Sequence, residues 1–569
     1  TVDNPITVSV QVQDQYGNPN TNFSGKVKLN VDSPTASVAG SGLINISSGV
    51  GNITVSNSKV EMVNLTMADT QGTGLNVSST QDVYFAVGIP KKFVFSSGMF
   101  NGTADNPVVV TVYAQDQYGN RVYTYNDDVR VNVSGSGTGS GVVDISGGQG
   151  SINITNRTVG VVDLTLQDIG SGLTVTHTAQ LTIVAGVQTQ FVILNPLDGT
   201  VDSPIPVTVE AQDNWGNRVL TYNQDVTLLA SGSSTGSGVV DIISGAGVRN
   251  ITNLKAETVL LSLTDSQATG LTVTSTQDVV FGTGLPKKFV LLDPVDGTVD
   301  GSINVQVQVH DVGGNIVSTY NGSVSITVNL AAEMSSSPGA KMGIVVISNG
   351  LGQRSISDRV AETVTIGLSD SAMSFLDVSM TQDVVFAPGV TTQFSILEPI
   401  DGTVDQAIPV TVQAQDQYGN KTPIYQTDVS LTTSGSATSS GLVDIVNGQG
   451  IIAVSDHTAE TVNLGLSDSQ STGLSVTSTK NVVFAAVAVS KYAIQNPVDI
   501  VVVTAIAVTI EALDQFGNRN PDFTADVSLS ASGSATLPAL GMVDINNGIG
   551  VIQVNDVVAE LVNLSLIDS

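Results

Sequence analysis

The sequence predicts an all-β protein built as a tandem array of six sandwich repeats of about 98 residues. Three observations predict it. A short turn-like string recurs six times along the 569 residues, alternating apolar and polar residues flank its copies, and helical periodicity is absent throughout. Alternation with a period of two is typical of half-buried strands, and self-similarity at a fixed period indicates a repeat architecture.

The recurring string sets the domain organisation. Its copies are VQDQYGN at 12–18, AQDQYGN at 114–120, AQDNWGN at 211–217, VHDVGGN at 309–315, AQDQYGN at 414–420 and ALDQFGN at 512–518. Their spacing predicts repeats at 1–88, 89–186, 187–284, 285–389, 390–487 and 488–569. We expect the first repeat to lack its first strand, the fourth to carry an insertion at 331–342, and the sixth to lack its last strand. The chain is therefore expected to be a window on a longer periodic array.

The fourth repeat shows how the strands are predicted. Apolar or alternating runs indicate strands at 285–292, 303–311, 322–330, 343–358 (a pair joined at NGLG), 361–371 and 375–386. Glycines in strings such as NGLG and GGQG are expected in hairpins rather than in phosphate-binding loops. Seven short strands in about 100 residues are typical of an immunoglobulin-like sandwich. Because the chain has no cysteine, the sequence predicts this architecture without the disulfide of antibody domains.

The string DQYGN is expected to end one strand and redirect the chain. Gly119 can adopt a positive φ and Asn120 tolerates one. Asp116 can accept hydrogen bonds from backbone N–H groups further along the turn. Tyr118 is expected to lie over the end of the sandwich, and Trp215, at the same position, is expected to be a turn residue as well. We therefore predict turn-stabilising roles for Asp14, Asp116, Asp213, Asp311, Asp416 and Asp514.

The same string carries a resemblance to a known group of repeats. With its flanks it matches the pattern VTVxAxDxxGNxV, and a hairpin of the form GxG follows it in most copies. In both marks the chain resembles the bacterial immunoglobulin-like repeats of prokaryotic surface proteins, the group found in invasin- and intimin-type adhesins. The fourth repeat departs from the pattern with VHDVGGNIV. The resemblance implies a surface or extracellular protein, but no ligand, since the group includes stalks, adhesins and sheath or filament components.

Composition narrows the function further. The net charge is −30, from 50 acidic and 20 basic residues scattered along the chain. Such a chain repels phosphate backbones, so we expect no nucleic-acid partner. The densest apolar run, at 487–510, is interrupted by Lys491, Asn496, Pro497 and Asp499, so no membrane span is expected in this segment. An acidic, hydroxyl-rich surface favours an extracellular or cell-surface location.

No catalytic site is predicted. The three histidines, His177, His310 and His457, fall in different repeats and at different repeat positions. A Ser-His-Asp arrangement would therefore have to form across domains. Thiol chemistry is excluded by the absence of cysteine. We expect neither an enzyme nor an organic cofactor.

Acidic pairs near the predicted repeat boundaries are candidate calcium ligands. The DGTVD string supplies Asp198, Asp202, Asp296, Asp300, Asp401 and Asp405, and the string TQDV adds Asp82, Asp278 and Asp383. Oxygen ligands between tandem domains suit Ca²⁺. Two alternatives remain open: the aspartates cap turns without an ion, or the lysine pairs at 91–92 and 287–288 neutralise them.

Glycosylation is a further candidate modification. The acceptor triplet Asn-x-Ser/Thr occurs at Asn22, Asn45, Asn52, Asn64, Asn76, Asn101, Asn132, Asn153, Asn156, Asn250, Asn321, Asn420 and Asn563. Asn64 and Asn563 share one repeat position and alternate with apolar residues, so both are expected to face outward. A chain rich in Ser and Thr also produces such triplets by chance.

Three classes of function compete. We favour a structural protein, a repeat stalk or a filament or sheath component that extends from or surrounds the cell, because the repeats resemble one another and none carries a distinctive loop. Its expected partners are other copies of itself or further repeats of the same chain. An adhesin or carbohydrate-binding protein that presents a binding tip is the alternative, with surface glycans as partners. An enzyme is the third class.

Overall fold

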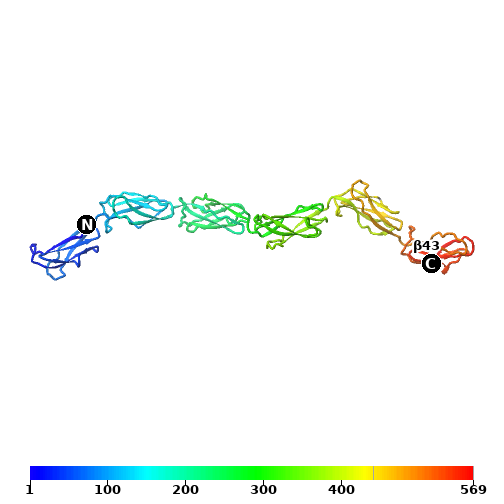
Figure 1. Ribbon diagram of the computed structural model, residues 1–569, viewed down its shortest axis with the longest axis horizontal. Coiled ribbons are helices and arrows are strands. Elements are labelled where there is room, and N and C mark those ends of the chain that lie inside the picture. Colours follow the sequence, from blue (N-terminus) through cyan, green and yellow to red (C-terminus); the bar gives the residue numbers. More distant parts are fainter. Residues whose placement is uncertain (440, 568–569) are drawn as a thin grey trace. The chain divides into compact units, whose positions relative to one another are not determined.

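The computed structural model describes residues 1–439 and 441–567, which fold as β-strands, loops and a single 3-10 turn, η1 (Pro538–Gly541). The chain divides into two compact units, Thr1–Gly284 and Leu285–Ser569. Figure 1 shows the strands of each repeat gathered in one body, coloured in sequence order. No helix of the described residues is long and apolar enough to cross a membrane.

The first unit contains three sandwiches. The first has strands β1 (Ile6–Gln11), β2 (Gly25–Val31), β3 (Ala36–Val38), β4 (Leu43–Ile46), β5 (Val50–Asn57), β6 (Glu61–Ala68) and β7 (Thr80–Phe85). The second has β8 (Lys92–Phe95), β9 (Met99–Thr103), β10 (Val108–Gln115), β11 (Val129–Val133), β12 (Gly141–Val143), β13 (Gln149–Ile154), β14 (Gly160–Asp168) and β15 (Thr178–Val184). The third has β16 (Gln188–Ile193), β17 (Gly199–Thr200), β18 (Ile205–Asp213), β19 (Val226–Ala230), β20 (Gly238–Val240), β21 (Ala246–Ile251), β22 (Glu257–Thr264) and β23 (Thr276–Gly282).

The second unit contains three more. The fourth sandwich has β24 (Lys288–Leu291), β25 (Gly297–Thr298), β26 (Ser302–His310), β27 (Gly322–Val328), β28 (Glu333–Met334), β29 (Met342–Ile347), β30 (Leu351–Ser357), β31 (Thr363–Ser369) and β32 (Gln382–Ala387). The fifth has β33 (Thr391–Ile396), β34 (Gly402–Thr403), β35 (Ile408–Asp416), β36 (Val429–Thr433), β37 (Thr438–Ser439), β38 (Leu442–Val443), β39 (Gln449–Ser455), β40 (Thr461–Ser467) and β41 (Lys480–Ala485). The sixth has β42 (Lys491–Ile494), β43 (Ile506–Leu513), β44 (Ala525–Ala531), β45 (Met542–Ile545), β46 (Ile549–Val554) and β47 (Leu564–Ile567).

Each sandwich contains two sheets. In the second repeat the sheets are β13-β10-β8 and β12-β11-β14-β15-β9. All neighbours are antiparallel except β9, which runs parallel to β15 with Met99 opposite Gln180. The third, fourth and fifth repeats show the same parallel pairing in β17–β23, β25–β32 and β34–β41. The predicted all-β, immunoglobulin-like tandem architecture is confirmed.

The cores follow the predicted alternation. Within the described residues, six separate hydrophobic cores form, and the buried residues of each lie inside one of the six expected ranges. On β10 the burial alternates, with Val110, Val112 and Ala114 fully buried. An aromatic pair at edge-to-face angles recurs in these cores, as in Phe93–Tyr125, Phe191–Tyr222, Phe289–Tyr320, Phe394–Tyr425 and Tyr492–Phe523. The boundary positions themselves stay predictions.

Hairpin glycines lie where the sequence places them. Between β29 and β30, Asn349 has φ 52° and Gly350 has φ 76°. Positive φ at both central residues is the geometry of a type I′ hairpin turn, which favours Asn-Gly. A Cβ on Gly350 would lie 2.6 Å from the carbonyl oxygen of Val317, so the tight packing of this turn also requires glycine.

The fourth repeat differs from the prediction in the start of its last strand. The last strand starts at Gln382, not at Phe375, which has φ 60° and is 92% exposed. Between them, Asp377 forms only an isolated bridge to Lys288. In the predicted insertion, β28 pairs with β30 and buries Met334. The first and fifth repeats have the same short strand in β3 and β37, so the extra residues do not add a new one.

The first and last sandwiches have fewer strands within the described residues. In the first, β1 pairs with β5 alone, whereas the equivalent β10 lies between β8 and β13. The free side of β1 forms part of an open groove of about 940 Å³, lined also by Phe23, Leu75 and Val77. In the sixth sandwich, the second sheet has the order β45-β44-β47, without an equivalent of β41 among residues 488–567.

Candidate functional site

The recurring DQYGN turn is built around its aspartate. Asp116 Oδ1 accepts hydrogen bonds from the backbone N–H groups of Tyr118 and Asn120, each at 2.9 Å, and Gly119 has φ 95°. The same pair of bonds forms at Asp14, Asp213, Asp311, Asp416 and Asp514. The predicted turn-stabilising role of these aspartates is confirmed.

The second carboxylate oxygen holds the linker that leads into the repeat. Asp213 Oδ2 accepts a hydrogen bond from Gly186 N at 2.8 Å, and Asp416 Oδ2 accepts one from Gly389 N at 2.9 Å. Burial of Asp213 opposes its charge, but the bonds from Asn217 and Gly186 outweigh it, so the pKa of this carboxyl lies below its usual value. The buried carboxylate therefore stays charged and ties the turn to the linker.

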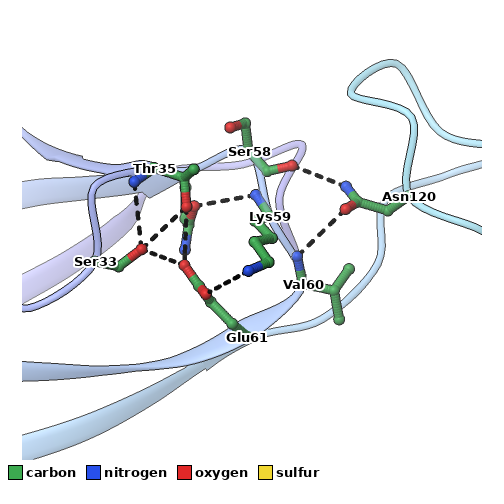
Figure 2. Close-up of polar contacts among 8 residues, drawn as sticks. Ser33, Thr35, Ser58, Lys59, Val60, Glu61 and Asn120 are labelled. Carbon is green, nitrogen blue, oxygen red and sulfur yellow. Dashed lines mark hydrogen bonds and ion pairs between the residues drawn. The ribbon is translucent and has the colours of Figure 1, made fainter.

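The asparagine of the turn reaches the preceding repeat. Asn120 Nδ2 donates to Ser58 O at 2.9 Å, and Val60 N donates to Asn120 Oδ1 at 3.4 Å (Figure 2). A side-chain amide thus pairs with one N–H and one C=O of a loop in the neighbouring sandwich. The same two-bond pairing joins Asn217 to Arg157 and Val159, Asn420 to Arg359 and Ala361, and Asn518 to His457 and Ala459. We call this pairing the junction clamp.

The aromatic residue of the turn also meets the preceding repeat. The Arg157 guanidinium carbon lies 4.0 Å from the ring centroid of Trp215, within the range of a cation–π interaction. Arg359 lies over Tyr418 at 5.9 Å, and His457 stacks on Phe516 at 4.6 Å. Trp215 lies in the turn, as predicted, and its ring also packs against a side chain of the preceding repeat.

The loop that receives the clamp is held by its own polar network. Asn57 Oδ1 accepts a hydrogen bond from Lys59 N, and Asn57 Nδ2 donates to Glu61 Oε1, both at 3.0 Å. Glu61 also accepts hydrogen bonds from the Ser33 and Thr35 hydroxyls (Figure 2). The hydroxyl of Ser33, followed by Asn57 and Thr35, lowers the pKa of Glu61 to about 2. The glutamate therefore remains an acceptor that fixes the loop over a wide pH range.

Among the DGTVD aspartates predicted as calcium ligands, Asp198, Asp296, Asp300 and Asp401 accept backbone hydrogen bonds. The first of each pair bonds the last strand of its own repeat at 2.8 Å: Asp198 to Val280 N, Asp296 to Val385 N and Asp401 to Val483 N. The second of each pair lies at the linker or in its own turn, with Asp300 bonded to Val390 N, Asp202 beside Gly284 and Asp405 bonded to Thr403 Oγ1. Asp405 thus matches the turn-capping alternative, whereas Asp198, Asp296, Asp300 and Asp401 bond backbone outside their own turn.

The carboxylates of the TQDV string do not join those of the DGTVD pairs in a larger cluster. Asp82 accepts from Asn64 Nδ2 and Asp383 from the Thr365 hydroxyl, both across neighbouring strands. Over residues 1–439 and 441–567, no group of three or more His, Asp or Glu side chains has the arrangement of a metal site. Calcium at the repeat junctions stays a prediction.

The glycosylation candidates differ in exposure. Asn22, Asn45, Asn52, Asn76, Asn101, Asn153, Asn250, Asn321 and Asn563 are exposed. Asn64, predicted to face outward, is half-buried, as are Asn132 and Asn420. Asn156 is 3% exposed and its Oδ1 accepts from Thr158 N, so a glycan there would disrupt the folded loop. A glycan on Asn420 would replace one hydrogen of Nδ2, the atom that donates to Arg359 O in the junction clamp.

The histidines stay apart, in three different repeats. His177 Nδ1 accepts from Phe95 N, His310 Nε2 contacts Gln308, and His457 Nδ1 lies 3.3 Å from Val404 O. The absence of a catalytic role stays a prediction.

Comparisons with known proteins give only distant likenesses. No protein-family model matches the chain, and no curated protein matches it. Among solved structures it is similar to the Escherichia coli adhesin FdeC, with 16% identity, 53% of this chain and 99% of that chain covered, and a TM-score of 0.31. It is also similar to invasin, a bacterial integrin-binding protein (15% identity, 71% and 81% covered, TM-score 0.27). Domains 4–9 of surface layer protein SbsC give 14% identity, 96% and 92% coverage and a TM-score of 0.21.

Proposed function

We propose that this chain is a structural protein of the cell surface or extracellular space, a repeat stalk or a filament or sheath component. The observation that carries the proposal is the junction clamp, which recurs at Asn120 and Asn217 in the first unit and at Asn420 and Asn518 in the second. A string that serves only a turn needs no partner in the neighbouring sandwich. Its repeated use between repeats suits a protein that works by holding its domains at a fixed spacing.

Several further features support this proposal. Each clamp is reinforced by a linker hydrogen bond to the turn aspartate, so neighbouring sandwiches are held through the backbone as well as through a side chain. The surface is acidic and rich in hydroxyls, which favours a soluble extracellular role. The proposal includes no catalytic activity and no organic cofactor, and its partners are copies of the same chain.

The proposal is tested by removing the clamps from the full chain. Alanine at Asn120, Asn217, Asn420 and Asn518 together should widen the distribution of angles between neighbouring repeats in electron micrographs and shorten the maximum dimension in small-angle scattering. Asn18→Ala is the matched control, because Asn18 occupies the same turn and donates to Asp14 within it. Unchanged angles and dimensions in the fourfold variant would show that the clamps do not set the spacing.

A second candidate, an adhesin, is favoured by one observation. An aliphatic residue that follows a proline is strongly exposed at the same position of four repeats: Leu197 at 87%, Val295 at 85%, Ile400 at 82% and Val498 at 79%. Leu197 borders a hollow of about 440 Å³ lined by Pro196, Pro204 and Pro206. Serine at these four positions should abolish attachment of the purified chain to cells if the adhesin proposal is right, and leave the stalk proposal untouched.

A further inference from the structure

The residue that holds the clamp loop differs between the two units. It is an asparagine in the first unit, at Asn57, Asn156 and Asn253, and an aspartate in the second, at Asp358, Asp456 and Asp556. In all six repeats its Oδ1 accepts a hydrogen bond from the backbone N–H two residues further on. The substitution therefore keeps one contact of the side chain and changes what its second polar atom can do.

That second atom has a different chemistry in the two units. Asn57 Nδ2 donates to Glu61 and Asn253 Nδ2 donates to Glu257, each at 3.0 Å. The aspartates carry Oδ2 in place of that donor, and a glutamate again stands four residues further on, at Glu362, Glu460 and Glu560. Oδ2 of Asp358, of Asp456 and of Asp556 is buried without a hydrogen-bond partner. A buried carboxylate oxygen that faces a second acceptor is costly unless a proton or a cation lies between them.

Of the three aspartates, the one in the fourth repeat has the least hydrogen bonding from neighbouring side chains. In the fifth, the Ser436 hydroxyl bonds both Asp456 and Glu460, and in the sixth Ser534 bonds both Asp556 and Glu560. In the fourth, Glu362 accepts from the backbone N–H of Ala331 at 2.8 Å instead, while Asp358 is as deeply buried as Asp456, both at 2% exposure.

We propose that Asp358 and Glu362 share one proton, which takes the place of the amide hydrogen that joins Asn57 to Glu61. Asp358 is buried and Glu362 is not. When two carboxylates are in contact, the pKa of one is strongly raised, and the protons of such a pair belong to the pair. A protonated Asp358 would donate from Oδ2 to Glu362, as Asn57 donates from Nδ2. A neutral replacement of the donor is simpler than a cation, because no third His, Asp or Glu joins this pair among residues 1–439 and 441–567.

The surroundings support this assignment. Burial, then the charge of Glu362, raises the pKa of Asp358, and the backbone bond from Val360 opposes this only in part. At Asp556 the Ser534 hydroxyl lowers the pKa instead, so the sixth repeat is not expected to hold such a proton. Nearby charged groups have other partners: Glu333 bonds Gly339 N, Lys341 bonds Leu330 O and Ala332 O, Arg359 lies over the Tyr418 ring, and Asp416 bonds Asn420. On β30, Arg354 donates to Ile344 O and Ser336 Oγ, and its Nε has no hydrogen-bond partner among the described residues.

The proton acts on the junction between the fourth and fifth repeats. Arg359 O and Ala361 N, which hold Asn420, lie next to Asp358 and Glu362 along the chain. Because the pKa of the folded carboxyl lies above its ordinary value of 3.8, the contribution to stability is complete below that value. It is lost as the pH rises through the raised pKa. The junction should therefore loosen with rising pH in this repeat and not in the first or third.

Hydrogen exchange with mass spectrometry on the full chain tests the proposal. Asp358→Asn recreates the asparagine of the first repeat and provides the control. Between about pH 4 and about pH 8, protection of the loop at 358–361 should fall in the wild type relative to Asp358→Asn, roughly tenfold for each unit by which the pKa is raised. The loops at Asn57 and Asn253 should behave alike in both proteins. An identical pH profile in wild type and variant would overturn the proposal.

Two further measurements keep the outcome unambiguous. Infrared difference spectra, wild type minus Asp358→Asn, should show a protonated carboxyl band at pH values below the raised pKa. In Glu362→Gln this band should disappear at a lower pH, because the adjacent negative charge is removed. If added Ca²⁺ instead restores protection in the wild type at high pH and a chelator removes it, the occupant is a cation and the shared proton is wrong.

Discussion

The first two copies of the DQYGN turn have the same internal bonds and different surroundings. Asp14 and Asp116 each accept hydrogen bonds from two backbone N–H groups and from the asparagine side chain of their turn. Asp14 is exposed, and Tyr16 is 81% exposed. Asp116 is fully buried, because the linker at Gly88 and the clamp to Ser58 cover it. The turn thus forms from local sequence alone, and its docked form adds contacts with a neighbouring repeat to the same geometry.

The largest effect is expected from removing the docked aspartate. Asp116→Ala should lower the free energy of unfolding of the second repeat by about 3 kcal/mol, because a charged acceptor of several hydrogen bonds is lost from a buried site. Hydrogen exchange of the β10 and β11 amides in the full chain measures it. Asp14→Ala should have a smaller effect, confined to the first repeat. Equal effects of the two substitutions would mean that docking adds nothing to the turn.

The next effect is expected from the clamp itself. Asn120→Ala removes the bonds to Ser58 and Val60 and should destabilise the loop of the first repeat by about 1 kcal/mol. Faster exchange of the Val60 amide is the readout. In Asn18→Ala the Val60 amide should exchange as in the wild type, since Asn18 donates to Asp14 of its own turn. A similar change in both variants would contradict a contact specific to the junction.

Acid should destabilise the clamp loop of the first repeat and not that of the second. The pKa of Glu61 is depressed from 4.5 to about 2, so its contribution to stability is present above 4.5 and is lost as the pH falls through about 2. The second repeat has Gly160 at the equivalent position and no such dependence is expected there. Pepsin cleavage near 58–61 should therefore rise toward pH 2 in the wild type. In Glu61→Gln it should not vary with pH beyond the enzyme's own profile.

A smaller effect is expected at the aromatic contact. Removing the Arg157 guanidinium from the face of Trp215 should weaken the junction by about 0.5–1 kcal/mol. Trp215 is the single tryptophan of the chain, so its fluorescence reports this junction alone. Arg157→Gln should increase the quenching of Trp215 fluorescence by iodide. Arg130→Gln, on a strand of the same sandwich, should leave the quenching unchanged.

The smallest effect is expected from chelation. Asp296 already accepts a backbone hydrogen bond from Val385, and Asp401 accepts one from Val483. A chelator should therefore leave the melting temperature of the full chain unchanged. A fall in melting temperature that added Ca²⁺ reverses would establish the calcium site that the sequence predicts.

The fold could be predicted from the sequence because its determinants are local. Alternation in β26, the Asn-Gly turn at 349–350 and the aspartate of each DQYGN string depend on residues within a few positions of one another. The start of β32 could not be placed, since the positive φ of Phe375 interrupts an apparently continuous apolar pattern. Strand propensity describes an average preference of each residue type, so it does not reveal a single residue with a non-strand backbone conformation.

The junction clamp could not be predicted in the same way. Asn120 and Ser58 lie 62 positions apart, and the amide of Asn120 has a sufficient local partner in Asp116. The available signal was a second recurrence: each loop carries Asn or Asp, and in five of the six repeats a Glu stands four residues further on, as in Asn57–Glu61 and Asp358–Glu362. This pair holds the loop whose backbone bonds the asparagine of the next repeat, so its recurrence marks the receiving side of the clamp.

The parallel pairing of β9 with β15 has a consequence for how a repeat would bear tension. When the two ends of the second repeat are pulled apart, the segment before β9 is drawn one way and the end of β15 the opposite way along the same axis. Neighbouring strands then slide against each other, so their hydrogen bonds carry the load together rather than opening one after another from an end. Forced unfolding is governed by the rate of crossing that barrier. A sandwich with this parallel pairing resists forced unfolding until the two strands slide past each other as a whole. The same pairing recurs in β17–β23, β25–β32 and β34–β41.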